Sequence, residues 1–234
     1  MDRAHRHDLK HDKFVEQVGH SVEYAADHRS QFLRYGAIAL GVIALAAGTW
    51  WYMSYQSGVR QDALRTAIRA QEAVVGQKET PFLVAYPDAA AKNTAVKKLW
   101  QDIAIKHSGS SEAMVAEYYM GINAADSGNL QEAEKHLKIV SESGKAEYSS
   151  QAKLSLARIY QASGRNNEAE KVLRGLMNDP SIMVSKEEAT LALGQVLAQS
   201  NPAEARKLLE PLRASRSAVS HAAISTLSEI PAAR

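Results

Sequence analysis

The most pronounced hydrophobic pattern in the chain is an apolar run that carries no charged residue between Arg34 and Arg60. A helix of about 20 such residues spans the hydrocarbon core of a bilayer. The pattern therefore predicts a transmembrane helix over 35–55. Aromatic side chains, which favour the headgroup level, flank its apolar centre at Tyr35, Trp50, Trp51, Tyr52 and Tyr55.

A cleaved signal peptide is the main alternative, because Ala44-Leu45-Ala46 resembles a small-residue cleavage site. Charged leaders of signal peptides are short, whereas this run begins only after residue 34 and continues through two tryptophans. We therefore expect an uncleaved signal anchor.

Arginines flank both ends of the span, so they do not decide its orientation by themselves. Short flanking segments carry more weight than long domains. We expect residues 1–34 to be a short cytoplasmic segment and the domain after the span to be periplasmic, or otherwise extracytoplasmic, at a bacterial inner (plasma) membrane.

Small residues recur along the span with helical spacing, at Ala37, Gly41, Ala44 and Gly48. Small faces allow transmembrane helices to approach closely, so this could be a packing face for another span. Chance is the alternative, because alanine and glycine are abundant here.

A repeated six-residue phrase dominates the second half of the chain. It occurs at 132–137, 168–173 and 204–209, with a constant period of 36 residues, and always includes an alanine (Ala133, Ala169, Ala205). A period of this length indicates a solenoid of stacked helical hairpins. We predict an all-α fold in which repeats fill residues 112–216.

The alanine belongs to the second helix of each hairpin, and the preceding helices are expected over 114–126, 150–162 and 186–198. Gly128 and Gly164 stand where the first helix of two copies should end, since glycine enters the left-handed conformation cheaply. The third copy has Ser200-Asn201-Pro202 there.

These hairpins resemble the tetratricopeptide repeat, which has small residues at its eighth and twentieth positions, an aromatic at its eleventh and a glycine in its turn. The third copy departs from this pattern, with Leu193 where a small residue is expected. The residues that match in the first two copies are Gly121, Ala133, Ala157, Tyr160, Gly164 and Ala169.

Weaker patterns flank the repeats. Residues 56–111 are expected to form a linker helix and a degenerate first hairpin, with helices over 59–76 and 94–107 and a loop from Thr80 to Pro87. Residues 217–234 should form a capping helix and tail, because a terminal helix closes a solenoid.

Composition excludes several kinds of site. The chain has no cysteine, so it has no disulfide, thiol nucleophile or cysteine-ligated metal. Its net charge of +2 is spread without a basic stripe, which argues against nucleic-acid binding. His5, His7 and His11 are best interpreted as part of a solvated tail that also contains a short amphipathic helix over 13–27. We expect no metal and no cofactor.

No catalytic motif is present. His107, His136 and His221 each stand alone, and no phosphate-binding glycine loop occurs. We therefore expect a protein that is not an enzyme.

A stack of hairpins exposes a groove lined by the first helix of each unit, which suits peptide segments of other proteins. Packing between units is the alternative for its apolar members. The predicted groove residues are Tyr118, Ile122, Leu154, Arg158 and Gln161.

The layout resembles the YfgM-like ancillary subunit of the bacterial SecYEG translocon, on the anchor over 35–55, the helix over 59–76 and the repeats. This resemblance implies a chaperone-like scaffold for exported proteins, with Sec translocon subunits and a membrane-bound prolyl isomerase as partners. Two alternatives remain: an envelope-assembly or cell-division coordinator, and a regulatory subunit of an unidentified enzyme. The oligomeric state is left open.

Overall fold

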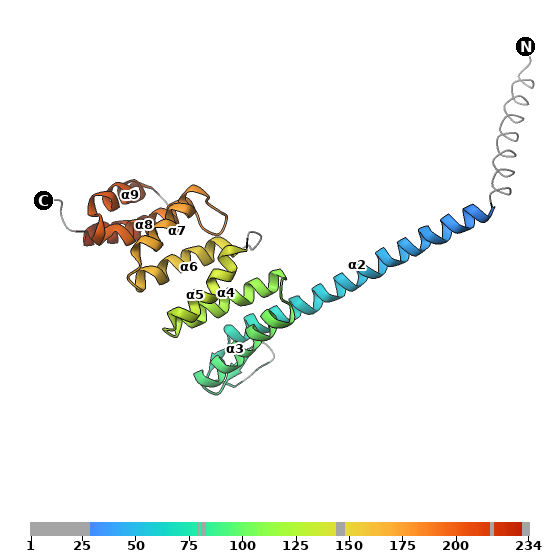
Figure 1. The fold of residues 1–234 in the computed structure, drawn as a ribbon. Coiled ribbons are helices and arrows are strands. Elements are labelled where there is room, and N and C mark those ends of the chain that lie inside the picture. Colours follow the sequence, from blue (N-terminus) through green and yellow to red (C-terminus); the bar gives the residue numbers. More distant parts are fainter. Residues whose placement is uncertain (1–28, 79, 81–82, 144–147, 216–217, 231–234) are drawn as a thin grey trace, which may run out of the picture. The chain divides into compact units, whose positions relative to one another are not determined.

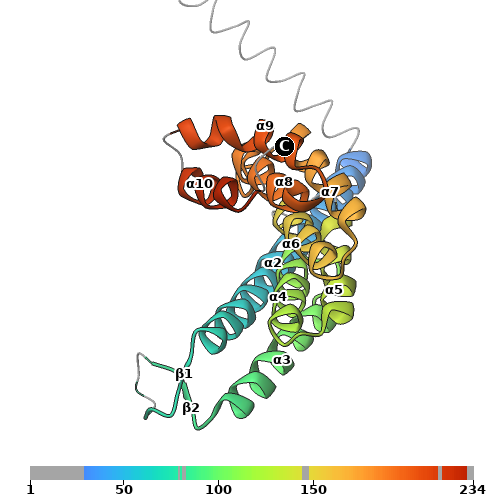
Figure 2. The ribbon, with the colours of Figure 1, turned by 90° about the vertical axis from the view of Figure 1, so that its left-hand side faces the viewer.

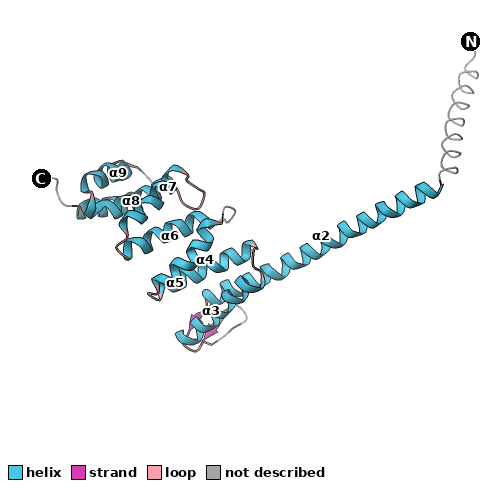
Figure 3. Cartoon of the chain, viewed as in Figure 1, coloured by secondary structure: helices cyan, strands magenta, loops and turns pink. Residues whose placement is uncertain are grey.

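The computed structural model describes residues 29–78, 80, 83–143, 148–215 and 218–230. These residues form nine helices and one pair of two-residue strands (Figure 3). The chain divides into two units, residues 1–58 and 59–234. The histidines of the amino-terminal segment and the helix expected over 13–27 lie outside the described residues.

The described part of the first unit belongs to helix α2 (Arg29–Gln71). An 18-residue window of this helix has a mean hydropathy of 1.6, and none of the residues in that window is buried. The helix is therefore long and apolar enough to cross a membrane, and it contains all of the span expected over 35–55. A Cβ atom added at Gly41 or Gly48 would meet nothing within 4 Å, so the expected packing face is open.

The second unit contains the end of α2 and all remaining elements. In chain order these are β1 (Val74–Val75), β2 (Ala85–Tyr86), α3 (Ala89–Lys106), α4 (Ser111–Asp126), α5 (Leu130–Glu142), α6 (Ser149–Ala162), α7 (Asn166–Asn178), α8 (Lys186–Ser200), α9 (Pro202–Ala214) and α10 (Ser220–Glu229).

Helices that follow one another in the sequence pack against one another from α3 to α10, as Figures 1 and 2 show. The hairpins α4–α5, α6–α7 and α8–α9 correspond to the three copies of the repeated phrase. The prediction of an all-α solenoid of stacked helical hairpins is thus confirmed. Helix α10 packs on both helices of the last hairpin and closes the series.

The turns inside the first two hairpins use glycine as predicted. Gly128 and Gly164 have φ angles of 78° and 73°, in the left-handed region that favours glycine. The third turn is shorter, because Asn201 ends α8 and also caps α9, whose first residue is Pro202.

This shorter turn corrects one sequence interpretation. The repeat pattern expects a small residue at Leu193, but the residue that faces the second helix is Gly194. A Cβ atom on Gly194 would lie 2.6 Å from Cγ of Leu209. Gly194 precedes Ala205 by eleven residues, whereas Gly121 precedes Ala133 by twelve. The third hairpin therefore keeps the small contact, with one residue fewer between the glycine and the alanine.

The region before the repeats also differs from expectation. The helix expected over 59–76 ends at Gln71. Val74–Val75, which the expected helix includes, pairs in parallel with Ala85–Tyr86 of the expected loop. β-Branched valines favour such extended pairing. The next helix begins five residues earlier than expected, at Ala89, because the Asp88 carboxylate accepts a hydrogen bond of 2.7 Å from the Ala91 amide.

The buried side chains form two clusters. The larger runs through the hairpins, where the repeated alanines and the leucines four residues later are fully buried. The smaller lies around Trp100, which packs with Ala67 and Ala70 of α2. Gln71 accepts a hydrogen bond from the Trp100 indole at 3.1 Å and exchanges two hydrogen bonds with Asn123. The end of α2 is thereby joined to α3 and α4.

The close contact between Gly121 and Leu137 predicts a steric effect of Gly121→Ala. Alanine is a better helix former than glycine by about 1 kcal/mol, but its Cβ atom would lie 2.6 Å from Cγ of Leu137. Overpacking typically costs about 1–3 kcal/mol. We expect a net loss of stability, measured as a lower thermal midpoint of the full chain in detergent micelles by circular dichroism.

Gly175→Ala is the matched control, because a Cβ atom on this helical glycine would meet nothing within 4 Å. It should raise the thermal midpoint, because alanine in place of glycine adds about 0.5–1 kcal/mol to the free energy of unfolding. Equal midpoints for the two variants would contradict the close packing.

Candidate protein-binding site

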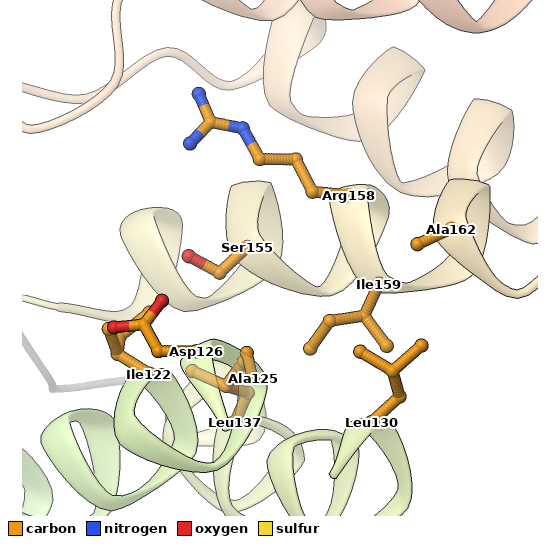
Figure 4. Close-up of a pocket in the computed structure, with 9 residues that line it drawn as sticks. All are labelled: Ile122, Ala125, Asp126, Leu130, Leu137, Ser155, Arg158, Ile159 and Ala162. Carbon is orange, nitrogen blue, oxygen red and sulfur yellow. The ribbon is translucent and has the colours of Figure 1, made fainter. Parts of the chain in front are cut away.

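A pocket of about 340 Å³ lies between the first hairpin and the first helix of the second. Its polar residues are Asp126, Ser155 and Arg158, and Figure 4 shows the Arg158 side chain extending away from the apolar ones. The apolar side chains come from α4, α5 and α6, namely Ile122, Ala125, Leu130, Leu137, Ile159 and Ala162. We call this hollow the apolar pocket.

The structure brings two of the five predicted groove residues together in the apolar pocket, Ile122 of α4 and Arg158 of α6. Gln161 lines a second hollow described below. Leu154 is buried in the larger core cluster and does not line either hollow. The sequence did not single out Ser155 or Ile159, although both lie one turn or less from Arg158 on the same helix.

Tyr118 is partly buried and belongs to a row of aromatic rings. Its centroid lies 5.0 Å from that of Tyr148 and 5.7 Å from that of Tyr119, which stacks on Trp100 at 4.7 Å. The Tyr118 hydroxyl donates to Oε1 of Gln151 at 3.0 Å. Burial is the main cause that raises the pKa of Tyr118. The residue joins α4 to α6 and supports the apolar pocket from one turn before Ile122.

The second hollow has a volume of about 970 Å³ and lies among the end of α6, the start of α7, α8 and α10. Four carboxamide side chains line it: Gln161, Asn166, Gln195 and Gln199. We call it the amide pocket. Only the Gln161 contribution was predicted, because the third repeat and α10 were not expected to face the same space.

His136 lies between two carboxylates, a contact that the sequence did not predict. Its Nδ1 lies 2.6 Å from Oε2 of Glu117 on α4, and its Nε2 lies 2.9 Å from Oε1 of Glu132, one turn earlier on α5. The His136 side chain is 8% exposed. The Glu132–His136 spacing was visible in the sequence, but nothing pointed to Glu117.

The hydrogen bond to the Glu117 carboxylate is the main cause that raises the pKa of His136, and burial opposes it. Both ring nitrogens are engaged, so His136 is not free to serve as a general base. In the part of the chain that the structure describes, no group of three His, Cys, Asp or Glu side chains has an arrangement that could hold a metal ion.

Ion pairs connect successive repeats on their second helices. Arg165, in the second turn, pairs with Glu134 of α5, and Arg174 of α7 lies 2.7 Å from Glu204 of α9. The hydrogen bond from Arg165 is the main cause that lowers the pKa of Glu134. The groups are partly exposed, so each pair contributes modestly to stability. Glu134 and Glu204, which belong to the first and third copies of the repeated phrase, thus each contact the second hairpin.

The His136 contacts predict a pH dependence of stability. Because the folded state raises its pKa, the stabilisation from His136 is complete below its ordinary pKa of about 6.5. It is lost as the pH rises through the higher pKa of the folded state. His136→Gln should therefore lower the urea midpoint more at pH 6 than at pH 9. The expected loss in the free energy of unfolding is about 2 kcal/mol at the lower pH.

His221→Gln is the control, because His221 is exposed on α10. Its urea midpoint should follow the wild type at both pH values. A difference between wild type and His136→Gln that is the same at pH 6 and pH 9 would contradict a protonated His136.

Comparison with known protein families matches residues 31–208 to the tetratricopeptide repeat-like domain. The matched range begins near the start of α2, before the apolar run, and ends within α9. Neither the curated proteins nor the solved structures gave a match. Tetratricopeptide repeat-like domains mediate contacts between proteins and are generally not enzymes. Since the match covers well over half of the chain, the protein belongs to the tetratricopeptide repeat-like domain family.

Proposed function

We propose that this protein is a membrane-anchored scaffold that holds segments of other proteins against its repeats. The observation that carries the proposal is the apolar pocket, where Ile122 and Ile159 line a hollow and Arg158 stands at its edge. Its volume of about 340 Å³ suits one or two apolar side chains of a ligand. An apolar recess with a few polar groups is the usual form of a recognition site.

The expected affinity is low for a single contact. Burying one large apolar side chain contributes about 1.5–3 kcal/mol, whereas micromolar binding requires about 8 kcal/mol. A ligand segment must therefore contact more of the repeat surface than this pocket. Such weak, distributed contacts favour reversible holding of segments, which a scaffold requires.

We further propose where the scaffold works. The apolar part of α2 would anchor it in a bacterial inner membrane, with residues 1–34 in the cytoplasm and the repeats in the periplasm. Its clients would be exported proteins, and Sec translocon subunits and a membrane-bound prolyl isomerase would be its neighbours. The anchored-repeat layout supports this, and a chain without cysteine suits an oxidising compartment. The open face of Ala37, Gly41, Ala44 and Gly48 would pack on another span.

Filling the apolar pocket tests the proposed function. Ala162 is an exposed lining residue and the last residue of α6, so Ala162→Trp should block the pocket and leave the fold intact. We expect it to reduce site-specific photo-crosslinking from position 155 to exported clients, and co-purification of translocon subunits, by about tenfold.

Ala214→Trp is the matched control, since Ala214 is the exposed last residue of α9 and lines neither pocket. It should crosslink like the wild type. Undiminished crosslinking of Ala162→Trp would show that the apolar pocket is not the contact.

Reporter fusions test the proposed orientation. Alkaline phosphatase, which folds to an active enzyme only after export, should be active when fused after Arg234. It should be inactive when fused after Arg34, on the other side of the span. Activity only in the Arg34 fusion would reverse the orientation, and activity in neither would exclude translocation of the repeats.

A further inference from the structure

The amide pocket differs from the apolar pocket in its chemistry. Its volume of about 970 Å³ is nearly three times as large. Gln161 lies in the last turn of α6, Asn166 is the first residue of α7, and Gln195 and Gln199 lie on α8. Figure 2 shows α8 and α10 side by side on this part of the chain, in agreement with their contacts.

The four carboxamides are exposed, and no other described residue hydrogen-bonds to any of their side chains. Three partly buried carboxamides of the second unit do have structural partners. Gln71 and Asn123 bond to each other, and Gln151 bonds to Tyr118 and to the Met183 carbonyl. The amide pocket thus presents several donors and acceptors that the fold itself does not use.

The lining carries little charge. Among its residues only Glu229 is ionisable, and Ser225 and Thr226 of α10 add hydroxyl groups. The Thr226 hydroxyl is already engaged, because it donates to the Ala222 carbonyl at 2.9 Å. A pocket without paired cations does not select an acidic ligand, and one without a continuous apolar surface does not select an apolar ligand.

A carboxamide resembles a peptide group, because each has an N–H donor and a C=O acceptor. A lining of carboxamides therefore complements the main chain of a polypeptide. It reads no side chain, since every non-proline residue offers the same donor and acceptor.

The spacing on α8 fits an extended chain. Gln195 and Gln199 are four residues apart, which is about 6 Å along a helix. Peptide groups that point to the same side of an extended chain recur every two residues, or about 6.7 Å. Two successive turns of α8 can therefore bond to two successive peptide groups.

We propose that the amide pocket binds the main chain of an extended polypeptide segment with little regard to its sequence. The proposal rests on the proposed function and specifies its ligand: the apolar pocket takes a side chain, and the amide pocket takes the backbone. This division suits a scaffold whose clients differ in sequence.

Three synthetic peptides of ten uncharged residues test this against the full chain in detergent micelles, with dissociation constants from fluorescence anisotropy. The first contains one leucine, the second has the same residues in scrambled order, and the third is the first with alternate amide nitrogens methylated. Scrambling should change the dissociation constant by less than about threefold. Methylation removes backbone donors and should weaken binding by at least about tenfold.

The double variant Gln195→Met/Gln199→Met keeps side-chain length and removes the carboxamides. It should weaken binding of the first peptide by about tenfold and abolish the difference between the first and third peptides. Gln131→Met is the control, since Gln131 is exposed on α5 and lines neither pocket. It should leave all three constants unchanged.

Two results would overturn the inference. One is a scrambled peptide that loses as much affinity as the methylated one, and the other is undiminished binding by the double variant. If Ala162→Trp still blocks client crosslinking in either case, the proposed function stands and only the backbone-binding role fails. Absence of binding by all three peptides, together with undiminished crosslinking of Ala162→Trp, would remove both.

Discussion

The close approach of the two helices within each hairpin is the constraint on which the repeat unit depends. In the first and third hairpins a glycine on the first helix faces a leucine on the second, as Gly121 faces Leu137 and Gly194 faces Leu209. An added Cβ atom would lie within 2.6 Å of the leucine in both cases. The alanine four residues before each leucine is fully buried, so both helices are small at their crossing. Leucine can then fill the space between hairpins and create the continuous core of a stack.

The row of aromatic rings connects the core of the hairpins to the smaller cluster at the start of the second unit. Tyr118 contacts the larger core cluster, and its neighbour Tyr119 contacts the smaller one, where it stacks on Trp100. Gln71 ties the same tryptophan to the end of α2. Helix α4 is therefore held from both sides. The side of α4 that carries Ile122 is consequently presented by a fixed helix, and a fixed site spends less free energy on ordering when a ligand binds.

Periodicity predicted the elements whose signal repeats and missed those whose signal is local. The 36-residue period located the three hairpins because buried leucines and alanines recur in phase. It placed Leu193 at the small position, which is held by Gly194, because the third copy has one residue fewer between the small position and the repeated alanine. It also failed for Leu154: Ala152, Leu154, Leu156 and Ile159 are all buried, so α6 has no single apolar face. The pairing of Val74–Val75 and the Glu117–His136 contact join distant residues without any pattern.

The last two residues of α6 line different pockets: Gln161 lines the amide pocket and Ala162 lines the apolar pocket. Adjacent residues of a helix point about 100° apart, so the end of α6 separates a site for apolar side chains from a site rich in carboxamides. A segment that fills both gains an effective local concentration for its second contact. Affinity then depends on the continuity of the segment across the end of α6 more than on any one side chain. An unfolded chain satisfies this condition, whereas a folded protein whose backbone groups are already paired does not. The arrangement of the two pockets therefore gives the proposed scaffold a physical means to distinguish unfolded clients from folded proteins.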